Sequence, residues 1–436
     1  MSPARRPAAR IGKMSSTIFI SAGEASGEHY GALLVAALQQ RLAAAGQTAE
    51  FFGMGGTRME AAGLERVVHA EEMAVMGLTE VVRHLPHIYR EFRKLKQAIR
   101  DRRPDVAVLI DFPEIHFRLA RELHRLGVPV LFFVSPQLWA WKKHRIKLVQ
   151  KYIREMLVIF PFEEPFYRER GVEAEFVGHP LAELPLPAIG REQFAAENGL
   201  DPAKTWIGLL PGSRPKEIRD HLPVILQAAR AIEQSAEKRV ELEGNPASGA
   251  KQAALADPDA RVQAPDYQFV VPLAPTLNAA QREEVRRLVE THGAGLAVRL
   301  VEDARAALFH ARASVVASGT ATVEAALICN PFIVVYRVSP LTYAIAKRVV
   351  KVPYVAMANL IAGKLAVPEL IQDDFTAANI VQQIGKLLPD GAARQSMIQE
   401  LAAIRNELTT RPAGQGEAGC AIGRVAAIAL RQIGAA

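Results

Sequence analysis

Cysteine is scarce in this 436-residue sequence, which contains only Cys329 and Cys420. Two cysteines cannot form a disulfide framework in a chain this long, so a reducing compartment is the simpler interpretation. A long hydrophobic run is also lacking, because the most apolar stretch, residues 128–141, contains two prolines, a serine and a glutamine. It is shorter than the roughly 18 apolar residues that a membrane-spanning helix needs. The P-loop, HExxH and CxxC signatures are absent too. These absences argue against a disulfide-rich scaffold, a membrane-spanning chain and a P-loop enzyme.

The composition is otherwise that of a globular protein, since half of the residues are apolar and 23% are charged. The length favours two or three domains. The net charge is +7, and the four basic residues before Met14 account for all but +3 of it. Because this beginning has no apolar segment, we expect residues 1–16 to form a disordered basic arm rather than a signal peptide.

From residue 17 onward, short apolar runs rich in β-formers alternate with small-residue turns and amphipathic helices. Strands are predicted in residues 17–22, 106–111, 129–135 and 155–160, with helices over about 28–45 and 115–126. Nearly continuous apolar strands separated by helices are typical of a parallel sheet that is covered on both faces. The first half of the chain is therefore expected to be doubly wound α/β.

A proline-rich stretch, residues 178–190, interrupts this alternation, which then resumes. Further strands are predicted in residues 206–214, 268–275, 295–300, 313–319 and 332–338. The expected fold class is α/β, with two Rossmann-like doubly wound parallel-sheet domains facing a cleft. The predicted domains are residues 17–185 and 186–375, with an inserted loop at 238–266. Helical periodicity alone continues over 376–436, and these helices are expected to pack back on the first domain or on a partner subunit.

A candidate general base lies where a first-half strand is expected to end. Asp111 closes the apolar run 106–111, which places its carboxylate at the carboxyl end of a buried strand. Burial there raises a carboxyl pKa toward working pH and makes the group a better proton acceptor for a sugar hydroxyl. The alternative is that Asp111 caps the next helix.

The turn after the first strand, residues 21–31, is rich in small residues. Such residues let the backbone approach an anion or sugar hydroxyls at a helix N-terminus, although a plain tight turn fits the pattern equally well. The turn carries three titratable residues, Glu24, Glu28 and His29.

Two strand ends in the second half favour phosphate binding. Residues 209–217 place Gly212, Ser213 and Arg214 at a strand end, where an arginine can grip a diphosphate. The second strand end carries Ser318, Gly319 and Thr320 before a helix that includes Glu324. Its alternative is a helix that Thr320 or Thr322 merely caps. Together the two loops predict a nucleotide-diphosphate site that needs no metal ion.

Residues 73–103 combine an apolar surface with a cationic flank. The apolar set is Met76, Leu78, Val81, Val82 and Leu85, and the flanking cations are Arg83, Arg90, Arg93 and Lys94. An anionic membrane surface attracts this combination. Two alternatives are ordinary surface helices and a nucleic-acid contact, although no nucleic-acid module is recognisable.

Many blocks, in order, resemble the lipid-A-disaccharide synthase family, which is family 19 of the GT-B glycosyltransferases. They include SAGEASGEHYGALLVAAL, FFGMGGTRMEAAG, MAVMGLTEVV, IDFPEIHFRLA, VSPQLWAWKKHRIK, FPFEEPFY, FVGHPLAE, LLPGSR, ASGTATVEAAL and YVAMANLIAGK. The resemblance runs from about residue 17 to about 375. The sequence departs from the family pattern in the basic arm, in the insert at 238–266, and at Glu28, where an Asp is common.

The resemblance implies an inverting transfer of 2,3-diacylglucosamine from UDP to 2,3-diacylglucosamine 1-phosphate (lipid X), which gives a β-1,6-linked disaccharide phosphate and UDP in lipid A biosynthesis. Asp111 would be the base. The donor residues would be Arg214, Ser213, Gly212, Ser318, Gly319, Thr320, Glu324 and Asn359, with Asn359 facing the donor. The acceptor loop would comprise Glu24, Ser26 and His29.

Because both substrates carry acyl chains, the resemblance also implies a peripheral enzyme on the cytoplasmic face of the inner membrane. It implies no metal or other cofactor and no nucleic-acid partner, and it leaves a homodimer open. The remaining alternatives are another GT-B enzyme acting on a UDP-amino sugar, such as an epimerase, and a non-catalytic protein that binds membranes or nucleic acid.

Overall fold

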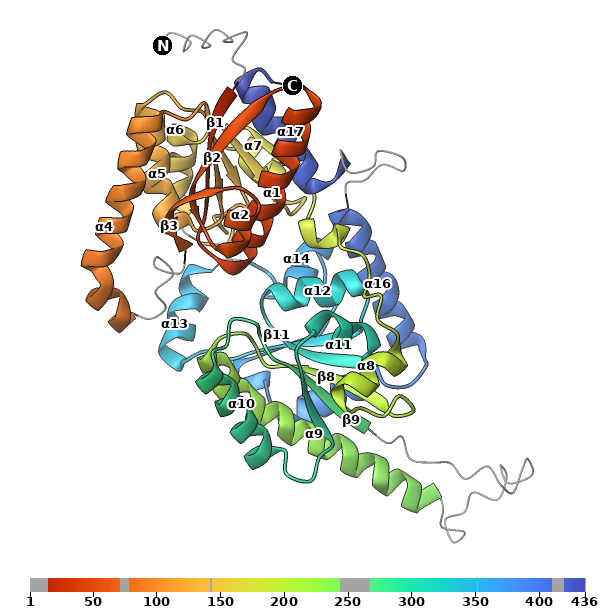
Figure 1. The fold of residues 1–436 in the computed structure, drawn as a ribbon. Coiled ribbons are helices and arrows are strands. Elements are labelled where there is room, and N and C mark those ends of the chain that lie inside the picture. Colours follow the sequence, from red (N-terminus) through yellow and green to blue (C-terminus); the bar gives the residue numbers. More distant parts are fainter. Residues whose placement is uncertain are drawn as a thin grey trace. The chain divides into compact units, whose positions relative to one another are not determined.

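The computed structural model describes residues 15–70, 78–141, 143–243, 267–350, 352–409 and 419–435. The chain divides into two compact units (Figure 1). One unit comprises Met1–Glu183 together with Glu407–Ala436, and the other comprises Leu184–Asn406. Each unit contains one sheet in which every strand pair is parallel.

The first sheet has seven strands in the order β3-β2-β1-β4-β5-β6-β7. Its strands are β1 (Ser15–Ala22), β2 (Thr48–Gly55), β3 (Glu65–His69), β4 (Val106–Ile110), β5 (Val130–Phe133), β6 (Glu155–Val158) and β7 (Ala174–Phe176). The helices of this unit are α1 (Ala25–Ala44), α2 (Thr57–Ala61), α4 (Leu78–Arg102), α5 (Pro113–Arg125), α6 (Ile146–Tyr152), α7 (Glu163–Arg168) and α17 (Ala421–Ile433), with 3-10 turns η1 (Lys143–Arg145) and η2 (Pro180–Glu183).

Alternate residues of each central strand enter opposite cores, as the period of two in a strand requires. Phe19 of β1 and Leu109 of β4 pack in a cluster with α4, α5, α6 and α7. Ile20 and Ile110 enter the opposite cluster, with α1, α2 and α17. Figure 1 shows α17 beside α1, so the end of the chain completes one face of the first sheet.

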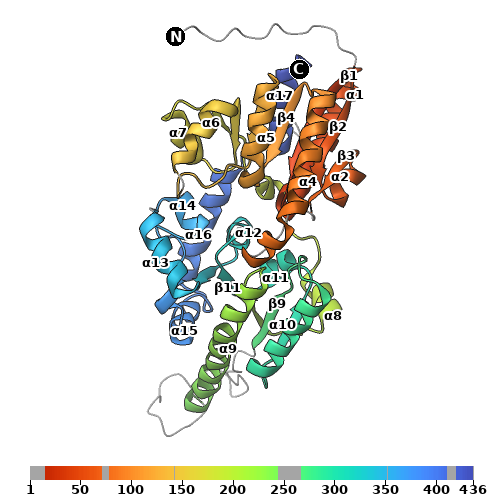
Figure 2. The ribbon, with the colours of Figure 1, turned by 90° about the vertical axis from the view of Figure 1, so that its left-hand side faces the viewer.

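The second sheet has six strands in the order β10-β9-β8-β11-β12-β13. Its strands are β8 (Thr205–Leu210), β9 (Tyr267–Pro272), β10 (Val298–Val301), β11 (Ala313–Ala317), β12 (Phe332–Tyr336) and β13 (Glu369–Ile371). The helices are α8 (Arg191–Asn198), α9 (Pro215–Glu243), α10 (Ala279–His292), α11 (Ala304–His310), α12 (Thr320–Ile328), α13 (Pro340–Val349), α14 (Met357–Ala362), α15 (Ala377–Gly385) and α16 (Ala392–Leu408), with 3-10 turn η3 (Gln372–Asp374). The long helix α9 packs beside α10 and α15 (Figure 2).

Each sheet contains one point where the strand order reverses, between β1 and β4 in the first sheet and between β8 and β11 in the second. In open α/β sheets, ligands bind outside the carboxyl ends of the strands at such a switch point. The loops at these points are those after β1, β4, β8 and β11, so topology alone selects the loops that carry Glu24, Asp111, Arg214 and Ser318.

The predicted α/β class with two doubly wound parallel sheets is confirmed. Strands β2, β3, β7 and β13 were not among the predicted strands. Helix α9 continues to Glu243, so the start of the expected inserted loop is helical, whereas residues 244–266 lie outside the described residues. Of the expected basic arm, residues 1–14 also lie outside them, and β1 begins at Ser15.

Candidate functional site

Asp111 immediately follows β4 at the switch point of the first sheet. Asp111 and Phe112 both have a φ of 51°, in the left-handed region, so the chain turns sharply between the strand and α5. The backbone N–H of Asp111 donates to the Phe133 carbonyl, 2.9 Å away at the end of β5. The N-cap of α5 is Phe112, which makes no side-chain cap. The alternative that Asp111 serves as the N-cap is therefore wrong, and its carboxylate is available for other chemistry.

A buried histidine fixes the backbone of Asp111. The Nδ1 atom of His116 lies 2.5 Å from the Asp111 carbonyl oxygen, which only accepts, so Nδ1 carries the proton. Nε2 then accepts from the Ser21 hydroxyl at 2.8 Å. Burial lowers the pKa of His116 to about 4, so the ring is neutral near pH 7. Because Ser21 belongs to β1, this chain of contacts ties the ends of β1 and β4 together, and sequence analysis missed it.

The surroundings of Asp111 raise the pKa of its carboxyl from 3.8 to about 6. Burial is the larger cause, and the negative charge of Glu24 adds to it, while a hydrogen bond from the Phe112 backbone opposes both. The residue before Glu24, Gly23, lies against the Phe112 ring, which brings Glu24 close to Asp111. A Cβ added at Gly23 would lie 2.3 Å from that ring, so only glycine fits this contact. The loop after β1 therefore packs directly on the loop after β4.

The predicted acceptor-loop residues lie at the start of α1, where Glu24 is the N-cap and Ser26 and His29 belong to the helix. Glu24 and Ser26 are exposed and His29 is partly buried. Burial and the positive charge of Arg58 lower the pKa of His29. Glu28, the departure from the family pattern, uses Oε1 to accept from the Arg58 backbone N–H at 2.7 Å. Glu28 thus holds the first turn of α2, which is a structural role.

A second buried carboxyl, missed by sequence analysis, lies beyond the ends of β5 and β6. Glu163 is 1% exposed and accepts from the Trp139 indole N–H at 3.0 Å and from the Phe160 backbone N–H at 3.2 Å. Beside it, the hydroxyls of Ser135 and Tyr167 share a 2.7 Å hydrogen bond. Burial raises the pKa of Glu163 to about 8, so its neutral form predominates near pH 7. This cluster joins the loop after β5 to α7.

Arg214 follows β8 at the switch point of the second sheet. Gly212 has a φ of 120°, and a Cβ there would lie 2.7 Å from the Glu217 carboxylate, so the turn requires glycine. One guanidinium nitrogen of Arg214 lies 3.1 Å from Glu217, while 63% of the side chain is exposed. Ser213 beside it is exposed as well. Glu217 thus orients an arginine that an anion can still reach.

The loop after β11 ends in a helix whose N-terminus has no side-chain cap. Gly319 is the N-cap of α12, with a φ of 154°. Thr322 instead donates its hydroxyl to the Gly319 carbonyl at 2.7 Å, so the expected alternative of a threonine cap is wrong for both Thr320 and Thr322. The Thr322 backbone N–H also donates to the Gly319 carbonyl, at 3.1 Å, so the N–H groups of Thr320 and Ala321 are the ones that remain available to an anion. Burial raises the pKa of Glu324 further along the helix.

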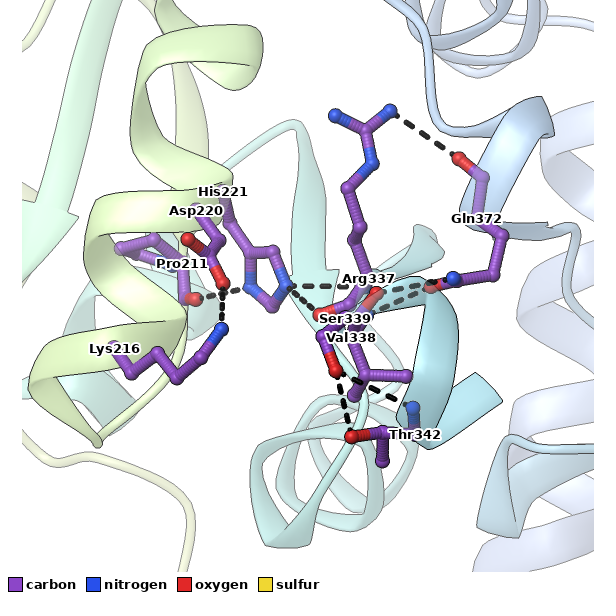
Figure 3. A network of polar contacts seen from close by, with 9 residues as sticks. All are labelled: Pro211, Lys216, Asp220, His221, Arg337, Val338, Ser339, Thr342 and Gln372. Atoms are coloured by element: carbon purple, nitrogen blue, oxygen red, sulfur yellow. Dashed lines mark hydrogen bonds and ion pairs between the residues drawn. The ribbon is translucent and has the colours of Figure 1, made fainter. Parts of the chain in front are cut away.

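A buried histidine links the Arg214 loop to the loop after β12 (Figure 3). His221 donates from Nδ1 to the Pro211 carbonyl at 2.8 Å, and its Nε2 accepts from the Arg337 backbone N–H at 3.1 Å. Gln372 joins the network by accepting from the Val338 backbone N–H at 2.7 Å. The network fixes Pro211, which begins the turn before Arg214. No local sequence pattern predicted this network.

Asn359 lies on α14 and is fully buried. Its amide nitrogen donates to the Val367 carbonyl at 2.9 Å and to Glu369 at 2.8 Å. Its oxygen accepts from the backbone N–H groups of Ala366 and Val367, both at 2.8 Å. Every hydrogen-bonding position of the amide is thus used inside the protein. Asn359 was expected to face the UDP-sugar donor, but in the structure its side chain holds the turn before β13.

The predicted membrane-contact residues are only partly described. Met76 lies outside the described residues, as do the side chains of Leu78, Val81, Val82, Arg83 and Leu85, whose backbone is part of α4. Arg90, Arg93 and Lys94 are exposed on α4, and Arg90 and Lys94 both pair with the buried Glu91.

Within the described ranges, His, Cys, Asp and Glu side chains form no group of three or more arranged to hold a metal ion. In the same ranges, none of the helices is sufficiently long and apolar to span a bilayer.

Two units, each with one doubly wound parallel sheet, match the architecture of the GT-B class of α/β proteins. The fold resembles that of CalG4, the calicheamicin glycosyltransferase, with a TM-score of 0.54 and 17% identity over 97% of this chain and 99% of that one. It also resembles the UDP-GlcNAc 2-epimerase of Neisseria meningitidis, with a TM-score of 0.55 and 13% identity over 96% of this chain and 99% of that one. At these identities the likeness shows the fold alone.

Sequence comparison gives the family. The family model described as lipid-A-disaccharide synthetase matches residues 18–243 and 251–414. The lipid-A-disaccharide synthase of Acidobacterium capsulatum is 56% identical over 402 residues, which cover 90% of this chain and 92% of the relative. This chain belongs to the lipid-A-disaccharide synthase family, so the predicted family and enzyme class are confirmed.

Proposed function

We propose that this protein transfers 2,3-diacylglucosamine from its UDP-activated form to the 6-hydroxyl of 2,3-diacylglucosamine 1-phosphate, and that Asp111 is the base. The family supports the overall reaction. The role of Asp111 rests on one observation: its carboxyl is partly buried at the switch point and has a pKa of about 6. Asp111 is also not the N-cap of α5.

In the proposed step, the acceptor hydroxyl oxygen attacks the anomeric carbon of the donor while its proton moves to Asp111. The bond from the anomeric carbon to the UDP oxygen breaks, and its electron pair leaves with UDP. A single displacement inverts the α-linked donor and gives the β-1,6 linkage. A base works best when its pKa lies near the operating pH, and a carboxyl with a pKa of about 6 is mostly ionised at pH 7 while still binding a proton far better than an ordinary Asp.

The backbone contacts of Asp111 serve this step by fixing the carboxylate. His116 is neutral near pH 7 and bonds to the carbonyl oxygen of Asp111, not to its carboxylate, so it positions the base rather than sharing its proton. Glu24, Ser26 and His29 are proposed to line the acceptor side, where the exposed Glu24 also tunes the base through its charge.

On the donor side, Arg214 and the backbone of Gly212 and Ser213 are proposed to bind the UDP diphosphate. The uncapped N-terminus would supply further donors from the N–H groups of Gly319 and Thr320 and from the Ser318 hydroxyl, since the Ser318 N–H is taken by the Val335 carbonyl. Glu324 would accept from the ribose hydroxyls. These groups would stabilise the negative charge that develops on UDP as the glycosidic bond breaks, without a metal ion. Asn359 contributes indirectly, by holding the turn before β13.

The acyl chains of both substrates support a peripheral position on the cytoplasmic face of the inner membrane. The proposed lipid-contact set is the one predicted from sequence, namely Met76, Leu78, Val81, Val82 and Leu85 with Arg83, Arg90, Arg93 and Lys94. The exposed cations Arg90, Arg93 and Lys94 of α4 suit anionic headgroups.

The test is to incubate the purified chain with both acylated sugars and to identify the products by mass spectrometry, with the new linkage assigned by NMR. UDP and a β-1,6-linked disaccharide phosphate are expected, in equal amounts. The control omits the acceptor: a change of configuration at C2 of the donor under these conditions would show an epimerase and contradict the proposal, as would an α linkage.

A further inference from the structure

Helix α13 of the second unit exposes apolar side chains to an unusual extent. Leu341 is 74% exposed, more than any other large hydrophobic side chain among the described residues, and Tyr343 is 36% exposed. Val355, in the segment that follows the helix, is 43% exposed. None of the described side chains of α13 is buried. Leu341 and Tyr343 therefore do not join the core of their unit.

Along residues 339–355 the charged side chains are all cationic, although the Glu369 carboxylate accepts from the Val355 backbone N–H at 3.0 Å. Residues 339–355 include Lys347, Arg348 and Lys351 and contain no Asp or Glu. The side chains of Lys347 and Arg348 are exposed on the same helix as Leu341 and Tyr343. Large apolar groups beside cations, with no acid, are the composition of a helix that lies in the interface of an anionic bilayer.

The exposed helix is firmly held at its start, so its exposure is not fraying. Ser339 caps it by accepting from the Thr342 backbone N–H at 3.3 Å, and the two hydroxyls lie 2.7 Å apart (Figure 3). The preceding residue, Val338, is bound through both backbone groups to the Gln372 side chain, at 2.7 and 3.1 Å. Because these contacts already fix the start of α13, the helix can bind a surface with little further loss of conformational entropy.

We propose that α13 is a lipid-binding surface of the second unit, which inserts Leu341 below the headgroups of an anionic bilayer and contacts the phosphates with Arg348, seven positions further on the same helix face, and with the adjacent Lys347. Anionic lipid fits this surface better than the same surface of a second copy, which would bring a second Lys347 and Arg348 against the first pair. The inference deepens the membrane association proposed above, but it places a contact on the second unit, whereas α4 belongs to the first.

The direct test puts a reporter at the most exposed position. Leu341→Trp is titrated with vesicles of phosphatidylglycerol and phosphatidylethanolamine that carry brominated acyl chains, which quench tryptophan only by contact. We expect quenching with these vesicles and little with vesicles of phosphatidylcholine alone. Phe309→Trp is the matched control, since Phe309 is 39% exposed on α11 and lies outside the proposed surface. Quenching at 309 but not at 341, or equal quenching at both, would overturn the proposal.

A second measurement is vesicle flotation of the full chain. Each cation near the surface contributes about a fivefold factor in affinity, so Lys347→Glu with Arg348→Glu should weaken binding to the anionic vesicles at least twentyfold. Arg286→Glu, on the exposed face of α10, is the control and should bind like the wild type. If the α13 variant binds the vesicles like the wild type, the surface does not bind lipid and the proposal is wrong. If Leu341→Ser leaves vesicle binding unchanged and only converts the free protein from dimer to monomer in sedimentation, the surface is a contact between copies of the chain, and the proposal is equally wrong. Because these assays contain no sugar, they are independent of whether transfer occurs.

Discussion

Replacing Asp111 by asparagine should make the protein more stable at pH 8, although it removes the proposed base. Burial and Glu24 raise the pKa of this carboxyl from 3.8 to about 6. Below about pH 4 the group is neutral in both the folded and the unfolded chain. Between the two pKa values only the unfolded chain loses its proton, so the free energy of unfolding falls as the pH rises, and above about pH 6 the loss is complete.

The size of this effect follows from the two pKa values. At about 1.4 kcal/mol for each pKa unit, the rise from 3.8 to about 6 corresponds to a loss of about 3 kcal/mol at pH 8. Asparagine is neutral at every pH and nearly the same shape, so it avoids this loss. For a unit of this size, about 2–4 °C of Tm per kcal/mol gives a Tm that is roughly 6–12 °C higher for Asp111→Asn at pH 8. Near pH 4 the two proteins should differ little.

Calorimetry of the wild type and of Asp111→Asn at pH 4 and pH 8 measures both gaps. The control variant Asp373→Asn removes an exposed carboxylate from the second unit and reports the effect of losing a negative charge alone. The reasoning fails if Asp111→Asn is less stable than the wild type at pH 8, or if the difference in Tm between the two proteins is the same at both pH values. Either result would show that the folded protein does not disfavour the ionised form of Asp111.

The rate should depend on Asp111 in the same way, so kcat/KM should fall below an apparent pKa near 6, and Glu24→Gln should shift this acid limb to lower pH because it removes a neighbouring negative charge; a limb that stays in place would contradict the coupling. Arg214→Lys should raise the donor Kd about tenfold, since the bidentate fork is lost, and should leave the Tm unchanged because the side chain is 63% exposed; isothermal titration with UDP and a thermal melt check both. Asn359→Ala should lower the free energy of unfolding by about 2–4 kcal/mol, because it leaves buried N–H groups without partners; chemical denaturation would refute this with a loss below about 0.5 kcal/mol, the range of an ordinary surface substitution.

Much of the fold could be predicted because its strongest strands are buried on both faces. Runs such as residues 106–111 consist almost entirely of apolar β-formers, and both sheet centres follow this pattern. Strand β3 was missed because it is a short edge strand with polar or charged residues, Glu65, Arg66 and His69, at three of its five positions. Strand β2 contains two glycines and a glutamate, which weaken its β-strand pattern.

The candidate site was predictable where one residue followed one strand, as Asp111 and Arg214 do. It was not predictable where the role depends on a distant partner. His221 contacts a backbone 116 positions away, and His116 reaches a serine 95 positions away. On a helix, such histidines are indistinguishable from core residues by local pattern. Asn359 shows the opposite case, since a motif position suggested a ligand contact while the folded chain uses the amide to hold its own turn.

The most direct test of the central claim compares turnover and donor binding in one variant. Single-turnover transfer is measured at pH 8 with the wild type and Asp111→Asn, both saturated with the two acylated sugars, alongside calorimetric titration with UDP. We expect the rate of Asp111→Asn to fall by at least about a hundredfold, the lower bound for a general base, while its Kd for UDP matches that of the wild type. A variant that retains the wild-type rate would show that Asp111 does not take the proton.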